Sequence, residues 1–174
     1  SLPPPPSSVS ESQLSVLKQQ GFPSGLSSAL YESATVHFPL RIWVVDNSGS
    51  MRANDGSRFV ETTRRNDVKV VRCTRWREIR ETVEYHAEMA ALLGAPTAFR
   101  MLNDPGIGNL GSVVGVGTAQ KFSVACGDGG STPEEDLRRA REIMHKSQPR
   151  GVTPLAFHIR EIRDEVAAHA DVLR

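Results

Sequence analysis

The segment LRIWVVDNSGSM, at residues 40–51, constrains the fold of this chain more than any other stretch of its sequence. It begins with a continuous apolar run rich in β-branched residues, which is typical of a strand covered on both faces, as in a parallel sheet. A carboxylate and two hydroxyls follow the run at alternate positions, as Asp46, Ser48 and Ser50. Residues two apart in an extended segment point the same way. The segment therefore predicts a core strand that ends in a cluster of oxygen atoms.

The rest of the chain alternates helical and strand patterns, which favours an α/β fold with a parallel-type central sheet. A β-hairpin is expected at about residues 57–74, inserted after the first strand. The remaining expected elements are helices at about 75–93, 131–146 and 153–173, and core strands at 97–103 and about 121–126.

Two of the expected helices begin with a Thr-Pro pair. Thr132 is predicted to be an N-cap, with Pro133 at the first helical position and Glu135 completing a capping box. By the same pattern, Thr153 is expected to cap the last helix and Pro154 to begin it. The side chains expected to form the buried stripe of that helix are Leu155, Ile159, Ile162, Val166 and Leu173.

The N-terminal region divides into two parts before the main domain, which is expected to span residues 38–174. Residues 1–12 are rich in proline and serine, a composition typical of a disordered linker. Residues 13–37 form a helical extension in which two short amphipathic helices are interrupted at the sequence GFP, residues 21–23. We expect this helical pair to pack on the main domain.

The composition narrows the class of protein. The chain has 174 residues, 39% of them hydrophobic, and a formal net charge of +1, which gives no field strong enough to attract nucleic acid. No apolar run reaches the roughly 20 residues of a membrane-spanning helix. Neither a signal-peptide pattern nor an Asn-x-Ser/Thr acceptor occurs, and Cys73 and Cys126 lack metal-binding spacing. An intracellular location with two reduced, half-buried thiols is the default expectation.

The oxygen cluster after the first strand suits a hard cation. One carboxylate and two hydroxyls are ligands for Mg²⁺, Mn²⁺ or Ca²⁺ rather than for Zn²⁺ or Cu²⁺. Asn47 and Gly49 lie between the candidate ligands, and glycine allows the loop to fold tightly around an ion. An ordinary turn, in which the Asp and Ser side chains bond their own backbone, is the alternative.

The sequence VVDNSGSM resembles the DxSxS motif of the metal-ion-dependent adhesion site in von Willebrand factor type A (vWA) domains. Those domains are doubly wound, Rossmann-like α/β folds that bind protein partners through a divalent cation. The resemblance implies that Asp46, Ser48 and Ser50 hold the ion, and that Thr153, in the sequence PRGVTPL, matches the threonine of a later loop. It spans about residues 38–174.

The resemblance is incomplete in two places. In the family a helix usually begins almost directly after the motif, whereas here residues 52–74, with the expected hairpin, intervene before the helix. This segment could bring Arg52, Asp55 or Arg58 to a partner, although surface decoration is the simpler role. The resemblance also implies that the chain covers only the N-terminal half to two-thirds of such a domain, without the fourth strand and its metal-binding aspartate. Asp128 is the one loop aspartate considered as a substitute. We therefore expect the strand carrying Asp46 to lie at an open sheet edge, either because the chain is a fragment or because a partner covers it.

The function implied is a protein-binding module, not an enzyme, in which the bound ion accepts an Asp or Glu carboxylate from the partner. Two alternatives remain open. One is a metal-dependent hydrolase or phosphotransferase that uses Asp46 as its nucleophile. The other is a degenerate vWA scaffold that no longer binds metal.

Overall fold

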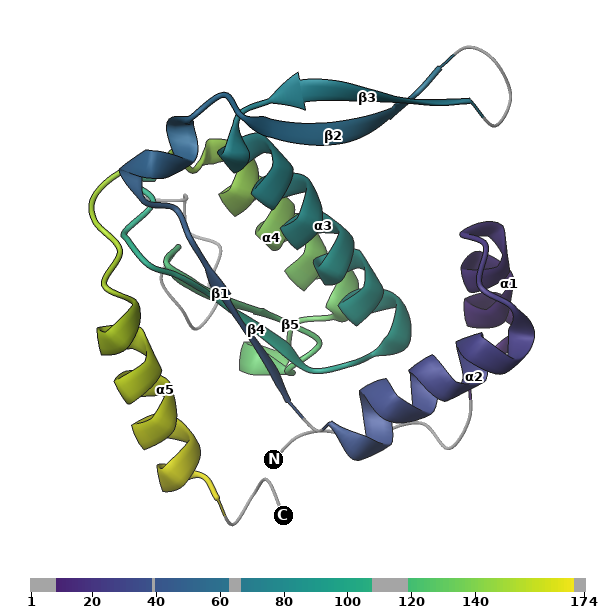
Figure 1. Ribbon diagram of the computed structural model, residues 1–174. Coiled ribbons are helices and arrows are strands. Elements are labelled where there is room, and N and C mark those ends of the chain that lie inside the picture. Colours follow the sequence, from purple (N-terminus) through teal and green to yellow (C-terminus); the bar gives the residue numbers. More distant parts are fainter. Residues whose placement is uncertain (1–8, 39, 63–66, 108–118, 171–174) are drawn as a thin grey trace.

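The computed structural model describes residues 9–38, 40–62, 67–107 and 119–170, and shows a mixed α/β fold (Figure 1). In chain order, its elements are α1 (Glu11–Gln19), α2 (Ser24–Glu32), the π-helical turn η1 (Ser33–His37), β1 (Arg41–Val45), the 3₁₀ turn η2 (Gly49–Arg52), β2 (Gly56–Glu61), β3 (Val68–Cys73), α3 (Arg75–Leu93), β4 (Thr97–Met101), β5 (Lys121–Val124), the 3₁₀ turn η3 (Asp128–Gly130), α4 (Pro133–Lys146) and α5 (Leu155–Ala168). Within these described residues, no helix has both the length and the apolar character needed to cross a bilayer.

The central sheet has the strand order β1-β4-β5 and is mixed rather than parallel. β1 pairs with β4 in parallel, whereas β5 pairs with β4 in the antiparallel direction. The expectation of a parallel-type sheet is therefore wrong for β5, because an apolar strand pattern carries no information about strand direction. The predicted hairpin is present as the separate β2–β3 sheet.

β1 is an edge strand of the described sheet. The Arg41 N–H donates to the Pro96 carbonyl at 3.1 Å, and the Val45 carbonyl accepts from the Leu102 N–H at 3.0 Å. Because backbone groups of alternate residues point to opposite sides of a strand, the backbone groups of Ile42 and Val44 point away from β4. The edge position matches the expectation for the strand that carries the oxygen cluster.

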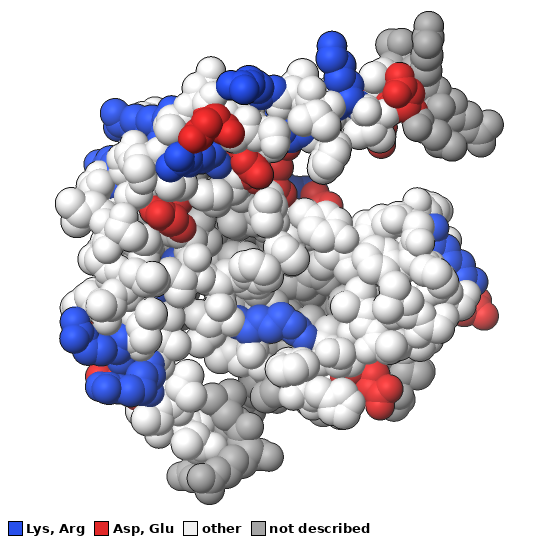
Figure 2. Space-filling model, in the orientation of Figure 1, with Lys and Arg blue, Asp and Glu red and all other residues white. Residues whose placement is uncertain are grey.

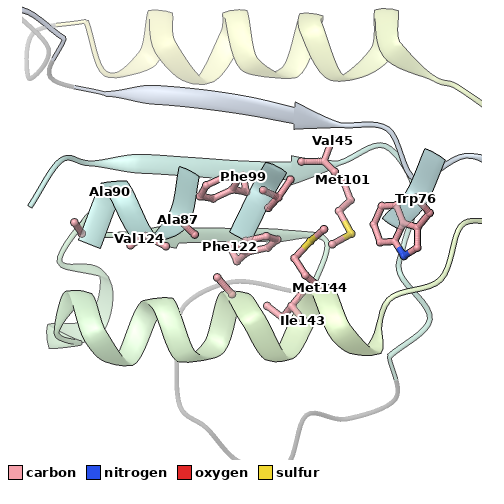
Figure 3. Packing of buried hydrophobic residues seen from close by; sticks show 13 residues of the cluster. Val45, Trp76, Ala87, Ala90, Phe99, Met101, Phe122, Val124, Ile143 and Met144 are labelled. Carbon is pink, nitrogen blue, oxygen red and sulfur yellow. The ribbon is translucent and has the colours of Figure 1, made fainter. Parts of the chain in front are cut away.

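The hydrophobic core lies between the sheet and the pair α3 and α4, which cover the same face (Figures 1 and 3). Phe99 of β4 and Phe122 of β5 stack at a centroid distance of 5.1 Å in its centre. The Trp76 ring closes one end of the core, and its Nε1–H donates to the Ser147 carbonyl at 3.2 Å. The predicted bounds of α3 and the predicted capping box of α4 at Thr132 are both confirmed.

α5 lies on the opposite face of the sheet, and its buried side is polar. Arg100 of β4, whose side chain is 7% exposed, forms ion pairs with Glu161 and Glu165, and Lys121 of β5 pairs with the same two carboxylates. His158 is buried, and its Nε2 bonds the Leu102 carbonyl at 2.9 Å.

The predicted apolar stripe of α5 is therefore wrong. Leu155, Ile159 and Val166 are exposed, and only Ile162 of the described stripe is half-buried; the neighbouring Phe157 is exposed as well. The reason is the buried guanidinium of Arg100, since a buried charge requires ionic partners and brings the carboxylate side of α5 inward. Leu173 lies outside the described residues.

The N-terminal helices pack on the C-terminal part of α3, as expected. Leu17 and Tyr31 form a second apolar cluster with Met89 and Leu93 of α3. α1 begins at Glu11 with a capping box at Ser10, so it starts two residues inside the segment expected to be a linker. The first eight residues of that segment lie outside the described residues.

Candidate functional site

Three loops meet beyond the C-terminal ends of β1 and β4, at residues 46–52, 102–106 and 147–154. Backbone hydrogen bonds join the first loop to the third: the Gly49 N–H donates to the Gly151 carbonyl at 3.0 Å, and the Arg150 N–H donates to the Asn47 carbonyl at 2.8 Å. The Arg52 guanidinium adds a bond from Nε to the Pro149 carbonyl at 2.9 Å. Ligand sites in open α/β sheets form at this end of the strands.

Asn47 joins the first loop to the second. Its side chain is fully buried, its Nδ2 donates to the Asn103 carbonyl, and its Oδ1 accepts from the Asn103 N–H, both at 2.8 Å. Asn103 in turn donates from Nδ2 to the Val152 carbonyl of the third loop at 2.7 Å. This pair of asparagines fixes the backbone between the two candidate ligands Asp46 and Ser48.

The structure brings the three oxygen-bearing residues of the motif together. Asp46 Oδ1 accepts from the Ser48 N–H at 2.8 Å, and the hydroxyl oxygens of Ser48 and Ser50 lie 2.9 Å apart. Gly49 lies between the two serines and begins the 3₁₀ turn η2. A Cβ at this position would lie 3.5 Å from the Gly151 carbonyl oxygen. The Asp46–Ser48 bond is also the contact expected of an ordinary Asp-stabilised turn, and the two roles are compatible.

Thr153 follows the third loop, but it does not cap α5. The N-cap is Pro154, with a non-helical ψ of 45°, and the helix begins at Leu155. The prediction of a Thr153 cap is therefore wrong by one position. Thr153 is exposed, and no hydrogen bond in the described part of the chain joins its hydroxyl to the Asp46–Ser50 segment. The loop is nevertheless anchored immediately before it, at Gly151 and Val152.

Asp128 cannot complete the ligand set. It follows β5. Because β5 runs antiparallel to β4, the C-terminal end of β5 lies at the opposite end of the strands from Asp46. Its carboxylate instead accepts from the Ser123 hydroxyl at 2.5 Å, and its carbonyl accepts from the Ser131 hydroxyl at 2.9 Å. Asp128 therefore stabilises a local turn.

Asp104 is a carboxylate near Asp46, beyond the C-terminal ends of β1 and β4, that was not predicted from the sequence. It follows β4, whose parallel pairing with β1 places it in the second loop. Its Oδ1 accepts from Arg150 Nη2 at 3.0 Å and from the Gly106 N–H at 2.7 Å. A carboxylate three residues after a core strand was the available signal. In this structure its partners are protein groups.

The candidate ligands are all oxygen atoms, which suits a hard cation, but they carry only one negative charge. Asp46, Ser48 and Ser50 offer only oxygen ligands, which Mg²⁺, Mn²⁺ and Ca²⁺ prefer. Among the described residues, no group of three His, Cys, Asp or Glu side chains gathers in a metal-binding arrangement. Any ion here would therefore rely on one carboxylate, hydroxyls and water.

Two charged residues of the hairpin region considered for partner contact have partners within the chain. Asp55 forms a two-bond ion pair with Arg75, at 2.7 and 2.6 Å, and the hydrogen bond from Arg75 is the main cause that lowers the pKa of Asp55. Arg58 Nη1 lies 3.2 Å from a carboxylate oxygen of Glu81. These pairs attach the β2–β3 hairpin to α3.

Comparison with known proteins gives no relative from which to transfer a role. No family model matches the chain, and neither a curated protein nor a solved structure matches it. The geometry of the three loops is therefore the basis for the function assigned below.

Proposed function

We propose that this chain is a divalent-cation-dependent protein-binding module of the vWA type, with its ion-binding loop at the end of β1. The observation that best supports the proposal is the grouping of the Asp46 carboxylate with the hydroxyls of Ser48 and Ser50 directly after a core strand. Thr153 is the proposed fourth ligand, from a loop that hydrogen bonds to the first at Gly49. Mg²⁺ is the proposed ion, with Mn²⁺ and Ca²⁺ as substitutes.

The arrangement of strands supports the same interpretation of the fold. The family resemblance predicts that the strand carrying Asp46 lies at an open edge in this chain, and β1 is an edge strand of the described sheet. Helices cover both faces of that sheet (Figure 1). We include in the proposal that this sheet corresponds to the N-terminal part of a doubly wound, Rossmann-like vWA domain.

The charge of the proposed site explains the kind of partner. One carboxylate from this chain leaves a divalent cation with one uncompensated positive charge, so an acidic side chain from another protein is the complementary ligand. An ion held at Asp46 would accept an Asp or Glu carboxylate in place of water. The buried Asn47 would hold Asp46 and Ser48 in position, and the adjacent anchoring of residues 151 and 152 would position Thr153.

Calorimetric titration of the whole chain with MgCl₂, MnCl₂ and CaCl₂ tests the ion site. We expect saturable binding with a Kd on the order of 10⁻⁴–10⁻³ M, because sites with few charged ligands hold these ions weakly. Asp46→Ala should abolish the metal-dependent heat. Asp128→Ala is the matched control. It removes a loop carboxylate at the opposite end of the strands and should leave the metal-dependent heat unchanged.

Absence of metal-dependent heat in the folded wild-type chain would show a scaffold without a metal site, and the proposal would be wrong. Equal heat from wild type and Asp46→Ala would place any ion elsewhere. Metal-dependent hydrolysis of p-nitrophenyl phosphate that disappears in Asp46→Ala would replace the binding module by an enzyme.

A further inference from the structure

A recess opens where the start of β1 meets α3 and the N-terminal helices. Its volume is about 260 Å³, and Figure 2 shows a hollow between the helical lobe formed by α1 and α2 and the rest of this face. Arg41 lies in its lining, five residues before Asp46. At about 3.3 Å per residue of strand, the two positions are roughly 16 Å apart, so the recess is distinct from the oxygen cluster.

Arg41 brings an unpaired positive charge into this recess. Its Nη1 is buried and has no hydrogen-bond partner in the described structure, and no ion pair of the described residues includes its guanidinium. Desolvation lowers the pKa of Arg41, but a guanidinium remains protonated at neutral pH. A buried donor without a partner is costly, and an anion placed against it would remove that cost.

The walls of the recess are aromatic and apolar. Trp43 stacks on His86 with a centroid distance of 4.1 Å, and Tyr85 meets the His86 ring edge-on at 5.5 Å. Desolvation also lowers the pKa of His86 and so disfavours a positive charge on this ring. The apolar side chains that complete the lining are Phe22, Leu30, Ala34, Met89, Ala90, Leu93 and Ala95.

The charge balance within the recess selects a monoanion. None of the described residues that line it is acidic, and Arg41 is the one lining side chain with a permanent charge. A carboxylate can accept two parallel hydrogen bonds from a guanidinium and is neutralised by it. A phosphate monoester carries close to two negative charges, so one of them would remain unpaired beside apolar walls.

We propose that this recess binds a small monocarboxylate with an aromatic or branched apolar body. The carboxylate pairs with the Arg41 guanidinium, and the apolar body packs against Trp43 and the side chains of α2 and α3. The volume lies just below the usual range of about 300–1,000 Å³ for drug-sized ligands, so a ligand of roughly ten heavy atoms fits.

The test uses the whole chain in the presence of EDTA, so that it does not depend on the proposed metal site. The probe is 3-phenylpropionate, and 3-phenylpropan-1-ol is its neutral analogue. Binding is followed by the indole N–H signals in ¹⁵N NMR spectra, because the chain has two tryptophans. Trp43 lines the recess, whereas Trp76 is buried in the main core and serves as an internal control.

We expect 3-phenylpropionate to shift the Trp43 signal saturably and to leave the Trp76 signal unchanged. Arg41→Gln should weaken binding roughly tenfold to hundredfold, the usual value of a charge-assisted hydrogen bond, and the alcohol should bind about as weakly to wild type. Arg138→Gln, which removes an exposed arginine of α4, should bind the probe like wild type. Arg41→Lys retains the charge and should restore part of the affinity.

Three results would overturn the proposal. One is no saturable shift with 3-phenylpropionate, 4-methylpentanoate or indole-3-acetate. Another is equal affinity in wild type and a folded Arg41→Gln variant. The third is binding of an acidic peptide by this recess without binding of any of the small carboxylates, which would make it a protein-docking surface instead.

Discussion

The side chain of Asn47 should contribute more to stability than any exposed residue of its loop. Replacement by alanine removes both of its hydrogen bonds to Asn103 and leaves the N–H and carbonyl of Asn103 without these partners. A hydrogen bond is worth about 1 kcal/mol net, and an unsatisfied buried group costs about 1–3 kcal/mol. We therefore expect Asn47→Ala to lower the free energy of unfolding by about 2–4 kcal/mol.

Urea denaturation followed by far-ultraviolet circular dichroism measures this loss, provided that the slope of the unfolding free energy against urea concentration is the same in the variant and in wild type. For a chain of this size, the same loss lowers Tm by about 4–16 °C. Asn103→Ala is the matched control, because it removes one exposed side-chain bond to Val152 and should cost less than about 1.5 kcal/mol. If Asn47→Ala costs no more than Asn103→Ala, the inference that Asn47 holds the loops together is refuted.

Three further results are expected. The pKa of Glu165 is lowered, because its pairs with Lys121 and Arg100 outweigh desolvation, which raises it. Glu165 therefore stabilises the fold at pH values above its pKa in the unfolded chain, and this contribution is lost as the pH falls through its pKa in the folded protein. In Glu165→Gln, Tm should depend less on pH below about pH 4.5 than it does in wild type. Burial raises the pKa of Cys126 to about 11, so iodoacetamide should label this thiol slowly at pH 8, as peptide mass spectrometry would show. Thr132→Ala removes the cap of α4 and should cost about 1 kcal/mol in urea denaturation.

The elements that the sequence predicts well are those whose signals are local. α3 combines an apolar face with a left-handed Gly94 at its end, and α4 begins with the complete capping box of Thr132 and Glu135. The hairpin was likewise predicted from two short β-rich runs. In each case, residues a few positions apart determine the structure.

The features that the sequence could not predict depend on contacts between distant residues. The buried side of α5 is set by Arg100, which is 61 and 65 residues away from its two glutamate partners. Asn47 and Asn103 are 56 residues apart, so their role as a joint between loops appears only when β1 and β4 pair. The Arg41 recess likewise requires α2, α3 and β1 to be brought together.

The attachment of α5 by ion pairs has a consequence for how the protein responds to salt. Glu161 and Glu165 are 34% and 50% exposed, so their attraction to Arg100 and Lys121 is open to screening by dissolved ions. Apolar contacts, which hold α3 and α4 to the other face, are strengthened rather than screened by salts such as sulfate. Raising the ionic strength should therefore loosen one layer of the molecule while it preserves the other.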